Sequence, residues 1–287
     1  MLNALAISKV FGTVAVATMI TVVAGQQQAK ADLLPDASGW DYAIGGSGNG
    51  TGGSVFDYKG IALKETEDTL FVAINSNMTL NGADWTSKGV TKTINYGDLF
   101  FNFSGKNFKE ASDQGLLSAV HFATRGSDSG VSEVGLYSNV KAKSVTRNNF
   151  GWNNVTDWSN AVKGNNSYGD LKSSDSYFAG QQTGSGLTVN GQAQGAVLTS
   201  IASGNKVGDI MMMDSNQLTS AGLNFGKFGT AANGTQTLGF SFKKTKDFKV
   251  GSNFIANLFA ECGNDGLAIK SAITKKVPEP STMAVWP

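Results

Sequence analysis

The sequence predicts an all-β protein, and three observations support this class. Runs of β-branched and aromatic residues recur about every ten residues, turns rich in Gly and Asn separate them, and helix signals are few. Several runs have apolar residues on both faces, so the sheets need cover on two sides. We therefore expect an antiparallel β-sandwich, jelly-roll-like, with long Gly/Asn/Ser-rich loops and few short helices.

The expected strands lie between residues 55 and 272. The clearest alternation of apolar with Thr, Gly and Ser residues is at 238–242, and residues 254–261 are expected to pair with that strand. A tight turn at 262–266 leads into the last strand, because Asn and Asp before Gly tolerate positive φ. The other expected strands are 55–62, 69–75, 94–103, 116–124, 131–137, 140–146 and 267–272.

Two short segments have helix signals. Residues 107–114 are expected to form a short turn. Residues 156–163 begin with a capping Thr156 and an early acid, Asp157, and end with a lysine before glycine. The surrounding region 148–185 is rich in Asn, Ser, Gly and aromatic residues, and it predicts a long insertion rather than a second domain.

The composition limits the partners of the chain. Charged residues make up only 16% of it and the net charge is +1, so we expect no basic surface for nucleic acid or an anionic membrane. The polar character comes from Asn, Ser, Thr, Gln and Gly, which suits contact with neutral polymers. The single cysteine excludes an intramolecular disulfide, and Cys262 is expected to be a buried, inert thiol on the apolar face of Leu258 and Ala260.

The N-terminus has the pattern of a secretory signal peptide. Lys9 is the only positive charge before an apolar run at 10–23, and Ala29-Lys30-Ala31 follows as a small-x-small cleavage site. We expect cleavage after Ala31, so that residues 1–31 are removed from the exported protein.

Two motifs could suggest a nucleotide or a catalytic site. Residues 48–53 have the spacing of a dinucleotide-binding glycine fingerprint, but a strand is expected behind them where that motif needs a helix. A hairpin loop is therefore predicted. His121 is the only histidine and no Gly-x-Ser-x-Gly motif accompanies it, so we expect a satisfied, partly buried side chain.

Carboxylates could still support glycoside hydrolysis, which requires two of them to face each other across a cleft. Residues 65–68 are expected to form a solvated turn, and a Ca²⁺ site there or around Asp128 remains an alternative. No cofactor or metal is assigned. The candidate carboxylates are Asp57, Glu65, Glu67, Asp68, Glu110, Glu133 and Glu261.

Seven aromatic residues in polar surroundings could present flat rings to sugars. In a sandwich, such residues more often cap the edges of the core, and that role is expected here. The seven are Trp40, Tyr42, Trp85, Trp152, Trp158, Tyr168 and Tyr177.

The C-terminal region contains Val277-Pro278-Glu279-Pro280-Ser281-Thr282. Each proline lacks an N–H and favours extended backbone, so residues 275–287 are expected to form an extended handle outside the single β domain, residues 32–274. The motif resembles the sorting signal of PEP-CTERM proteins, which bacteria export and hand to an exosortase at the membrane. The segment Glu261-Cys262-Gly263-Asn264-Asp265 resembles a Glu-Cys-Gly-Asn-Asp segment that many of these proteins have before the handle.

The resemblance implies a transient exosortase partner. The family's signal continues with a hydrophobic span and a basic cluster, whereas residues 283–287 are fewer than the roughly 20 apolar residues of a span. The handle is thus expected to be truncated and unable to retain the protein in the membrane.

We expect an exported, non-enzymatic surface or extracellular-matrix protein for display or adhesion in the exopolysaccharide layer, with exopolysaccharide as a candidate partner. The alternatives are a carbohydrate-binding, lectin-like module and a polysaccharide-active hydrolase.

Overall fold

The computed structural model describes residues 37–45, 54–162, 166–184, 188–189, 192–193 and 195–275. These residues all belong to one compact unit. The predicted signal peptide with Ala29 and Ala31, the glycine loop at 48–53 and the motif at 277–282 lie outside the described residues. Within the described part of the chain, no helix is long and apolar enough to span a membrane.

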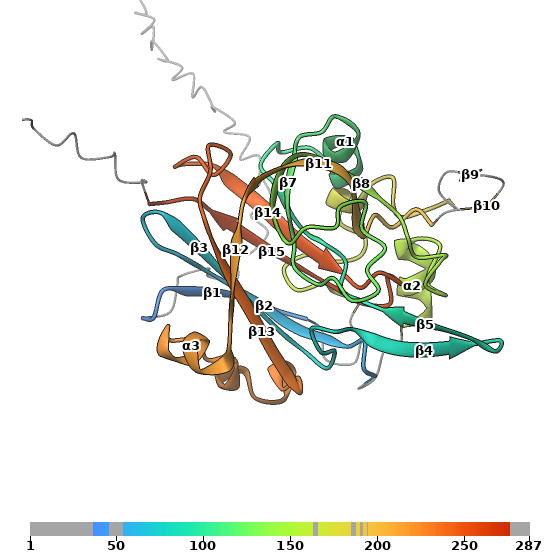
Figure 1. The fold of residues 1–287 in the computed structure, drawn as a ribbon, viewed down its shortest axis with the longest axis horizontal. Helices are drawn as coiled ribbons and strands as arrows, with labels where there is room; N and C mark the ends of the chain where they lie inside the picture. The colour runs from blue at the N-terminus through green and yellow to red at the C-terminus, as the bar shows by residue number, and fades with distance from the viewer. Residues whose placement is uncertain are drawn as a thin grey trace, which may run out of the picture. The chain divides into compact units, whose positions relative to one another are not determined.

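Two antiparallel sheets dominate the structure (Figure 1). The five-stranded sheet consists, in order of hydrogen bonding, of β1 (Trp40–Ile44), β2 (Tyr58–Glu65), β3 (Thr69–Ser76), β13 (Gln236–Lys243) and β12 (Ile210–Met213). The six-stranded sheet consists, in the same sense, of β11 (Ser200–Gly208), β8 (Gly135–Lys143), β7 (Leu117–His121), β6 (Leu99–Asn102), β14 (Asn253–Phe259) and β15 (Gly266–Ala272).

Smaller elements connect and cover these sheets. Two hairpins pair β4 (Ala83–Ser87) with β5 (Val90–Ile94), and β9 (Thr188–Val189) with β10 (Gln192–Ala193). The helices are short: α1 (Phe108–Asp113), α2 (Val155–Ala161), α3 (Ser215–Ser220), and the 3₁₀ segments η1 (Ser176–Phe178) and η2 (Phe225–Ala232).

The two sheets pack face to face around an apolar core. Alternating side chains of β3 and β14 meet there, namely Leu70, Val72 and Ile74 with Phe254, Ala256 and Leu258. All of them are buried, as expected of the inner-face residues of a sandwich. The predicted fold class, an antiparallel β-sandwich with long loops and few short helices, is confirmed.

Three of the expected strands are divided or joined differently in the structure. The run 94–103 is interrupted between β5 and β6, because the Asn95 side chain accepts a hydrogen bond from the Tyr96 N–H (2.7 Å) and competes with sheet pairing. The runs 131–137 and 140–146 both overlap one strand, β8, which is bulged near Asn139 (φ +52°).

The expected pairing of β13 with β14 is wrong. β13 pairs with β3 and β12, whereas β14 pairs with β6 and β15, so the connection between them crosses from one sheet to the other. The rings of Phe242 and Phe254 instead meet Phe101, with centroids 5.7 and 5.8 Å apart. The predicted turn after β14 does join it to β15 as an antiparallel pair.

The two predicted helical segments are present. α1 is capped by Asn107, whose side chain accepts from the Glu110 N–H. α2 begins one residue earlier than expected, and its cap is Asn154 and not Thr156, because the Asn154 side chain accepts from the Asp157 N–H.

Candidate functional site

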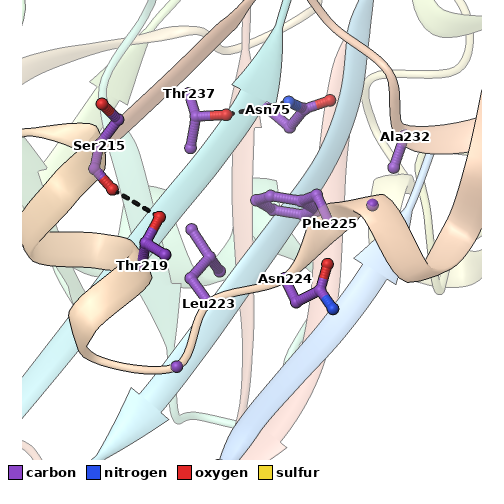
Figure 2. Close-up of a pocket in the computed structure, with 10 residues that line it drawn as sticks. Asn75, Ser215, Thr219, Leu223, Asn224, Phe225, Ala232 and Thr237 are labelled. Carbon is purple, nitrogen blue, oxygen red and sulfur yellow. Dashed lines mark hydrogen bonds between the residues drawn. The ribbon is translucent and has the colours of Figure 1, made fainter.

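A pocket lies on the outer face of the five-stranded sheet, between the sheet and the segment from α3 to η2 (Figure 2). Its volume is about 570 Å³, a size typical of small-molecule sites. We call it the outer pocket. Its lining residues are Asn75, Ser215, Thr219, Gly222, Leu223, Asn224, Phe225, Gly226, Ala232 and Thr237.

Local sequence places α3 over the sheet. Asp214 and Gln217 form a capping box, in which each side chain accepts from the backbone N–H of the other residue. The helix has one buried residue, Leu218, which lies against Gly239 of β13. A Cβ at Gly239 would lie 2.5 Å from the Leu218 side chain, so glycine allows this close approach.

The floor of the pocket consists of Phe225, which belongs to η2 and packs on the sheet, and of Asn75 and Thr237 on the sheet itself. Phe225 is only 6% exposed and packs edge-on against Tyr42, with ring centroids 5.5 Å apart. The buried Asn75 amide donates to the Thr237 hydroxyl oxygen (3.1 Å) and accepts from the Gly234 N–H (2.8 Å). The floor therefore combines an aromatic ring with a rigid polar pair.

The rim consists of uncharged polar side chains. Ser215, Thr219 and Asn224 are exposed, and the Thr219 hydroxyl donates to the Ser215 carbonyl (2.8 Å). Asn224 precedes η2, but its side chain makes no capping hydrogen bond. Lys227, on the same segment, lies over the Tyr42 ring, 3.8 Å from its centroid. The ten lining residues include no charged side chain.

A second hollow lies beside α2. This edge groove has a volume of about 580 Å³ and is lined by Arg147, Gly151, Trp152, Asn153, Asp157, Asn160 and Ala161. Several of its polar groups have partners within the protein. The Arg147 guanidinium donates to Asn153 (2.8 Å) and the Trp152 indole N–H donates to Asn264 (3.2 Å).

The segment from Glu261 to Asp265 forms the turn between β14 and β15 and is anchored on several sides. The Asn264 carbonyl accepts from the Trp158 indole N–H (2.7 Å), and the Asp265 carboxylate accepts from the Tyr58 N–H (2.7 Å). Trp152 donates its backbone N–H to the Cys262 carbonyl (3.1 Å). The turn thus fastens the 148–184 region to the sandwich.

Glu261 is fully buried in this turn. Its carboxylate accepts from the Asp128 N–H (2.6 Å), the Ser127 hydroxyl (3.1 Å) and the Asn95 N–H (3.2 Å). Burial raises the pKa of Glu261 to about 7, and the nearby Asp128 charge adds to the rise, while the backbone hydrogen bonds oppose it. Through these contacts, the Glu261 side chain joins its own turn to Asn95 and to the loop that contains Ser127 and Asp128.

His121 is buried and satisfied. Its Nδ1 lies 2.7 Å from one carboxylate oxygen of Asp98, and the other oxygen accepts from the Ser129 hydroxyl (2.8 Å) and the Ile201 N–H (2.6 Å). A catalytic triad needs the serine to hydrogen-bond to the histidine. Here Ser129 donates to Asp98 and not to His121, so the three side chains do not have the arrangement of a triad. Their contacts instead stabilise the end of the six-stranded sheet. The expected satisfied histidine is confirmed, and it is more deeply buried than expected.

The other candidate carboxylates are dispersed. Glu67 is exposed in the expected turn at 65–68. Five others pair with lysines: Asp57 with Lys59, Glu65 with Lys244, Asp68 with Lys243, Glu110 with Lys106, and Glu133 with Lys206. Among the described residues, no group of three or more His, Cys, Asp or Glu side chains could hold a metal ion.

Most of the seven aromatic candidates belong to the core, as expected. Trp40, Trp158, Tyr168 and Tyr177 are buried, and Tyr42 and Trp152 are partly buried. Trp85, on β4, is half exposed and lies edge-on to Phe56. Cys262 is a buried free thiol in the sandwich core, in the same cluster as Leu258 and Ala260, and burial raises its pKa to about 12.

The outer pocket was not predicted from the sequence. Its rim comes from α3 and the start of η2, which were not expected to be helical. A local signal was available, because the capping pair Asp214 and Gln217 precedes Gly222 at a positive-φ position. Searches against protein-family models, curated proteins and solved structures find no significant match to this chain.

Proposed function

We propose that this chain is an exported, exosortase-sorted, non-enzymatic surface or extracellular-matrix protein that acts by display or adhesion in the exopolysaccharide layer. The observation that carries the proposal is the position of the Val277–Thr282 motif in the sequence, which follows the anchored residue Lys275 with only Lys276 between them. A processing enzyme needs such a motif outside the folded core.

The anchor at the end of the body supports this division of the chain. The Lys244 side chain is fully buried, pairs with Glu65 (2.7 Å) and donates to the Lys275 carbonyl (2.6 Å). Glu65 also accepts from the N–H and the hydroxyl of Thr274 (2.9 and 2.8 Å). These contacts fix the chain up to Lys275 and support a handle that begins there.

The proposal of a non-enzymatic role is supported by the same contacts that hold the carboxylates. A glycosidase needs two carboxyl groups facing one substrate. Glu65 and Glu110 each form an ion pair with their own lysine, and Glu261 is enclosed by loop backbone. The purified protein should therefore turn over no glycoside, ester or peptide substrate. Turnover that disappears on replacing one carboxylate would favour the hydrolase alternative.

Sorting is tested with a chain that carries a hydrophobic span and a basic tail after Thr282. In a host with an exosortase, this chain should be processed, and the mature N-terminus should begin at Asp32. The Pro278→Ala/Pro280→Ala variant should not be processed, because it restores the backbone N–H groups and relaxes the extended conformation. Equal processing of the variant would contradict the proposed role of the motif.

A carbohydrate-binding, lectin-like function is the second candidate. The observation that favours it is the outer pocket, whose uncharged lining is chemically suited to sugar hydroxyls.

A further inference from the structure

We propose that the outer pocket binds an uncharged sugar residue of a neutral polysaccharide. That the protein meets such a polymer in the exopolysaccharide layer rests on the proposed function. The choice of this site and of a neutral sugar as its ligand rests on the pocket itself. The pocket combines an apolar floor at Phe225 with hydroxyl and amide groups around it (Figure 2). A sugar ring has the complementary arrangement, with C–H groups on its faces and hydroxyl groups at its edge.

The polar groups have hydrogen-bonding capacity left for a ligand. Thr237 accepts from the Asn75 amide, so its own hydroxyl proton can be donated to a ligand. The Thr219 hydroxyl donates to the Ser215 carbonyl, so its oxygen lone pairs can accept. The Asn224 side chain, which makes no capping bond, supplies both a donor and an acceptor. These three groups can recognise hydroxyls, each of which both donates and accepts.

The pocket is also preorganised. Asn75 lies on β3, is 4% exposed, and holds Thr237 on the neighbouring strand. The Asn224 backbone N–H donates to the Tyr42 hydroxyl (2.9 Å), which fixes the start of η2 over the sheet. Rigid donors and acceptors reduce the entropy that binding must overcome.

The absence of charge from the lining selects among ligands. Phosphate and carboxylate groups are recognised by Arg or Lys side chains, and the ten lining residues include neither. The edge groove differs in this respect, since Arg147 and Asp157 line it and much of its polar surface is already hydrogen-bonded. The outer pocket is therefore the better site for a neutral polymer.

The test is affinity electrophoresis of the full chain through native gels that contain dextran, galactomannan or soluble starch, with alginate as the anionic comparison. At least one neutral polysaccharide should retard the protein. Thr219→Trp places a bulky side chain at the rim and should weaken that binding by more than about tenfold. Asn224→Ala removes one hydrogen-bonding group and should weaken it about threefold to tenfold.

Ser220→Trp is the matched control, because Ser220 is exposed on the same helix but does not line the pocket. It should bind within about twofold of wild type, and all three variants should keep the wild-type near-UV circular dichroism and unfolding midpoint. The proposal is overturned if no neutral polysaccharide retards the wild type, if only alginate does, or if Thr219→Trp binds as well as Ser220→Trp.

These outcomes are separate from those of the sorting experiment. If the chain binds a neutral polysaccharide but is not processed by the exosortase, the proposed binding site is supported and the proposed sorting to the exopolysaccharide layer is contradicted. Processing of a chain that binds no neutral polysaccharide would overturn this inference alone.

Discussion

The two sheets cover their outer faces in different ways. The six-stranded sheet buries that face under α1, α2 and η1, where the Trp158 ring stacks on Tyr168 with centroids 4.3 Å apart. The five-stranded sheet places Ala62, Ala73 and the larger Trp40 under a thin layer built around Leu218 and Phe225. The edge groove beside α2 is lined by no strand residue, whereas the outer pocket under the thin cover reaches the sheet at Asn75 and Thr237.

The manner of attachment also differs. The thick cover is tied to the Glu261–Asp265 turn by indole N–H groups, including that of Trp158, and by backbone contacts. The thin cover is held directly on the strands, by Leu218 against Gly239, by the hydrogen bond from Asn224 to Tyr42, and by the Ala221 carbonyl, which accepts from the Trp40 indole N–H (3.0 Å) and the Lys64 side chain (2.7 Å). We infer that the first face contributes mainly to stability, while the second can tolerate changes that alter binding.

The largest expected contrast comes from two glycines. At Gly151, a Cβ would lie 1.8 Å from the Cys262 carbonyl oxygen, and this backbone atom cannot move aside locally. Gly151→Ala should therefore cost more than about 4 kcal/mol of unfolding free energy or prevent folding. At Gly239, the clashing atom is the end of the flexible Leu218 side chain, so Gly239→Ala should cost only about 1–2 kcal/mol. Urea unfolding measures both, and equal costs would contradict the contrast between the two faces.

Buried rings give the second contrast. Trp158→Ala should cost about 3–5 kcal/mol, because it creates a cavity under the thick cover and leaves the Asn264 carbonyl without its indole donor. Phe225→Ala should cost about 2 kcal/mol, since this side chain borders the outer pocket and solvent can enter the space it leaves. The same urea titrations apply. A larger loss for the Phe225 variant would show that the thin cover is the more important one for stability.

The alternation of apolar and polar residues along the strands was enough to predict part of this fold from the sequence. Alternation located β3, β13, β14 and β15 to within a few residues and placed Cys262 in the core. It could not identify the partner of β13, because alternation reports which side chains are buried and not which strand lies alongside. The break at Asn95 depends on a side chain that hydrogen-bonds to the next backbone N–H, which periodicity does not register.

The outer pocket could not be predicted from strand alternation either, but for a different reason. Its lining comes from the consecutive elements α3, η2 and β13 and from β3, which is far from them in the chain and meets them only in the folded sheet. Asn75 and Thr237 become neighbours through strand pairing, and neither stands in a recognisable motif. The Glu261–Asp265 segment was noticed for its resemblance, but its anchoring role required the contacts to Trp152, Trp158 and Tyr58.

The side of the sandwich that holds the thick cover is also predicted to be sensitive to pH. The pKa of Glu261 is raised to about 7 by burial, above its usual 4.5, so the folded state binds this proton more tightly than the unfolded state. Protonation of Glu261 therefore stabilises the folded state fully at a pH below the pKa that Glu261 has in the unfolded state. This stabilisation is lost as the pH rises through about 7. Between pH 5 and pH 8, the loss should be on the order of 2–3 kcal/mol.

Unfolding free energies at pH 5 and pH 8 check this prediction. Glu261→Gln cannot ionise and should show a smaller decrease over this range, whatever its stability at pH 5. Glu110→Gln is the control, because Glu110 lies on the surface of α1, paired with Lys106, and its pKa is lowered rather than raised. If Glu261→Gln kept the full wild-type decrease, the pH dependence would have to come from another group.

The smallest expected effect concerns the end of the chain, which belongs to neither outer face. A chain that ends at Lys276 keeps β15 and every contact of Glu65 with Thr274 and Lys275. Its unfolding free energy should match that of the full chain within about 0.5 kcal/mol, the usual size of surface changes away from special features. A chain that ends at Ile273 is the matched comparison. It loses the hydrogen bonds to Glu65 and the carbonyl that accepts from the buried Lys244, and it should cost about 1–3 kcal/mol. If the cut at Lys276 were as costly as the cut at Ile273, residues 277–287 would contribute to the β body, and the motif would be less accessible to a processing enzyme than proposed.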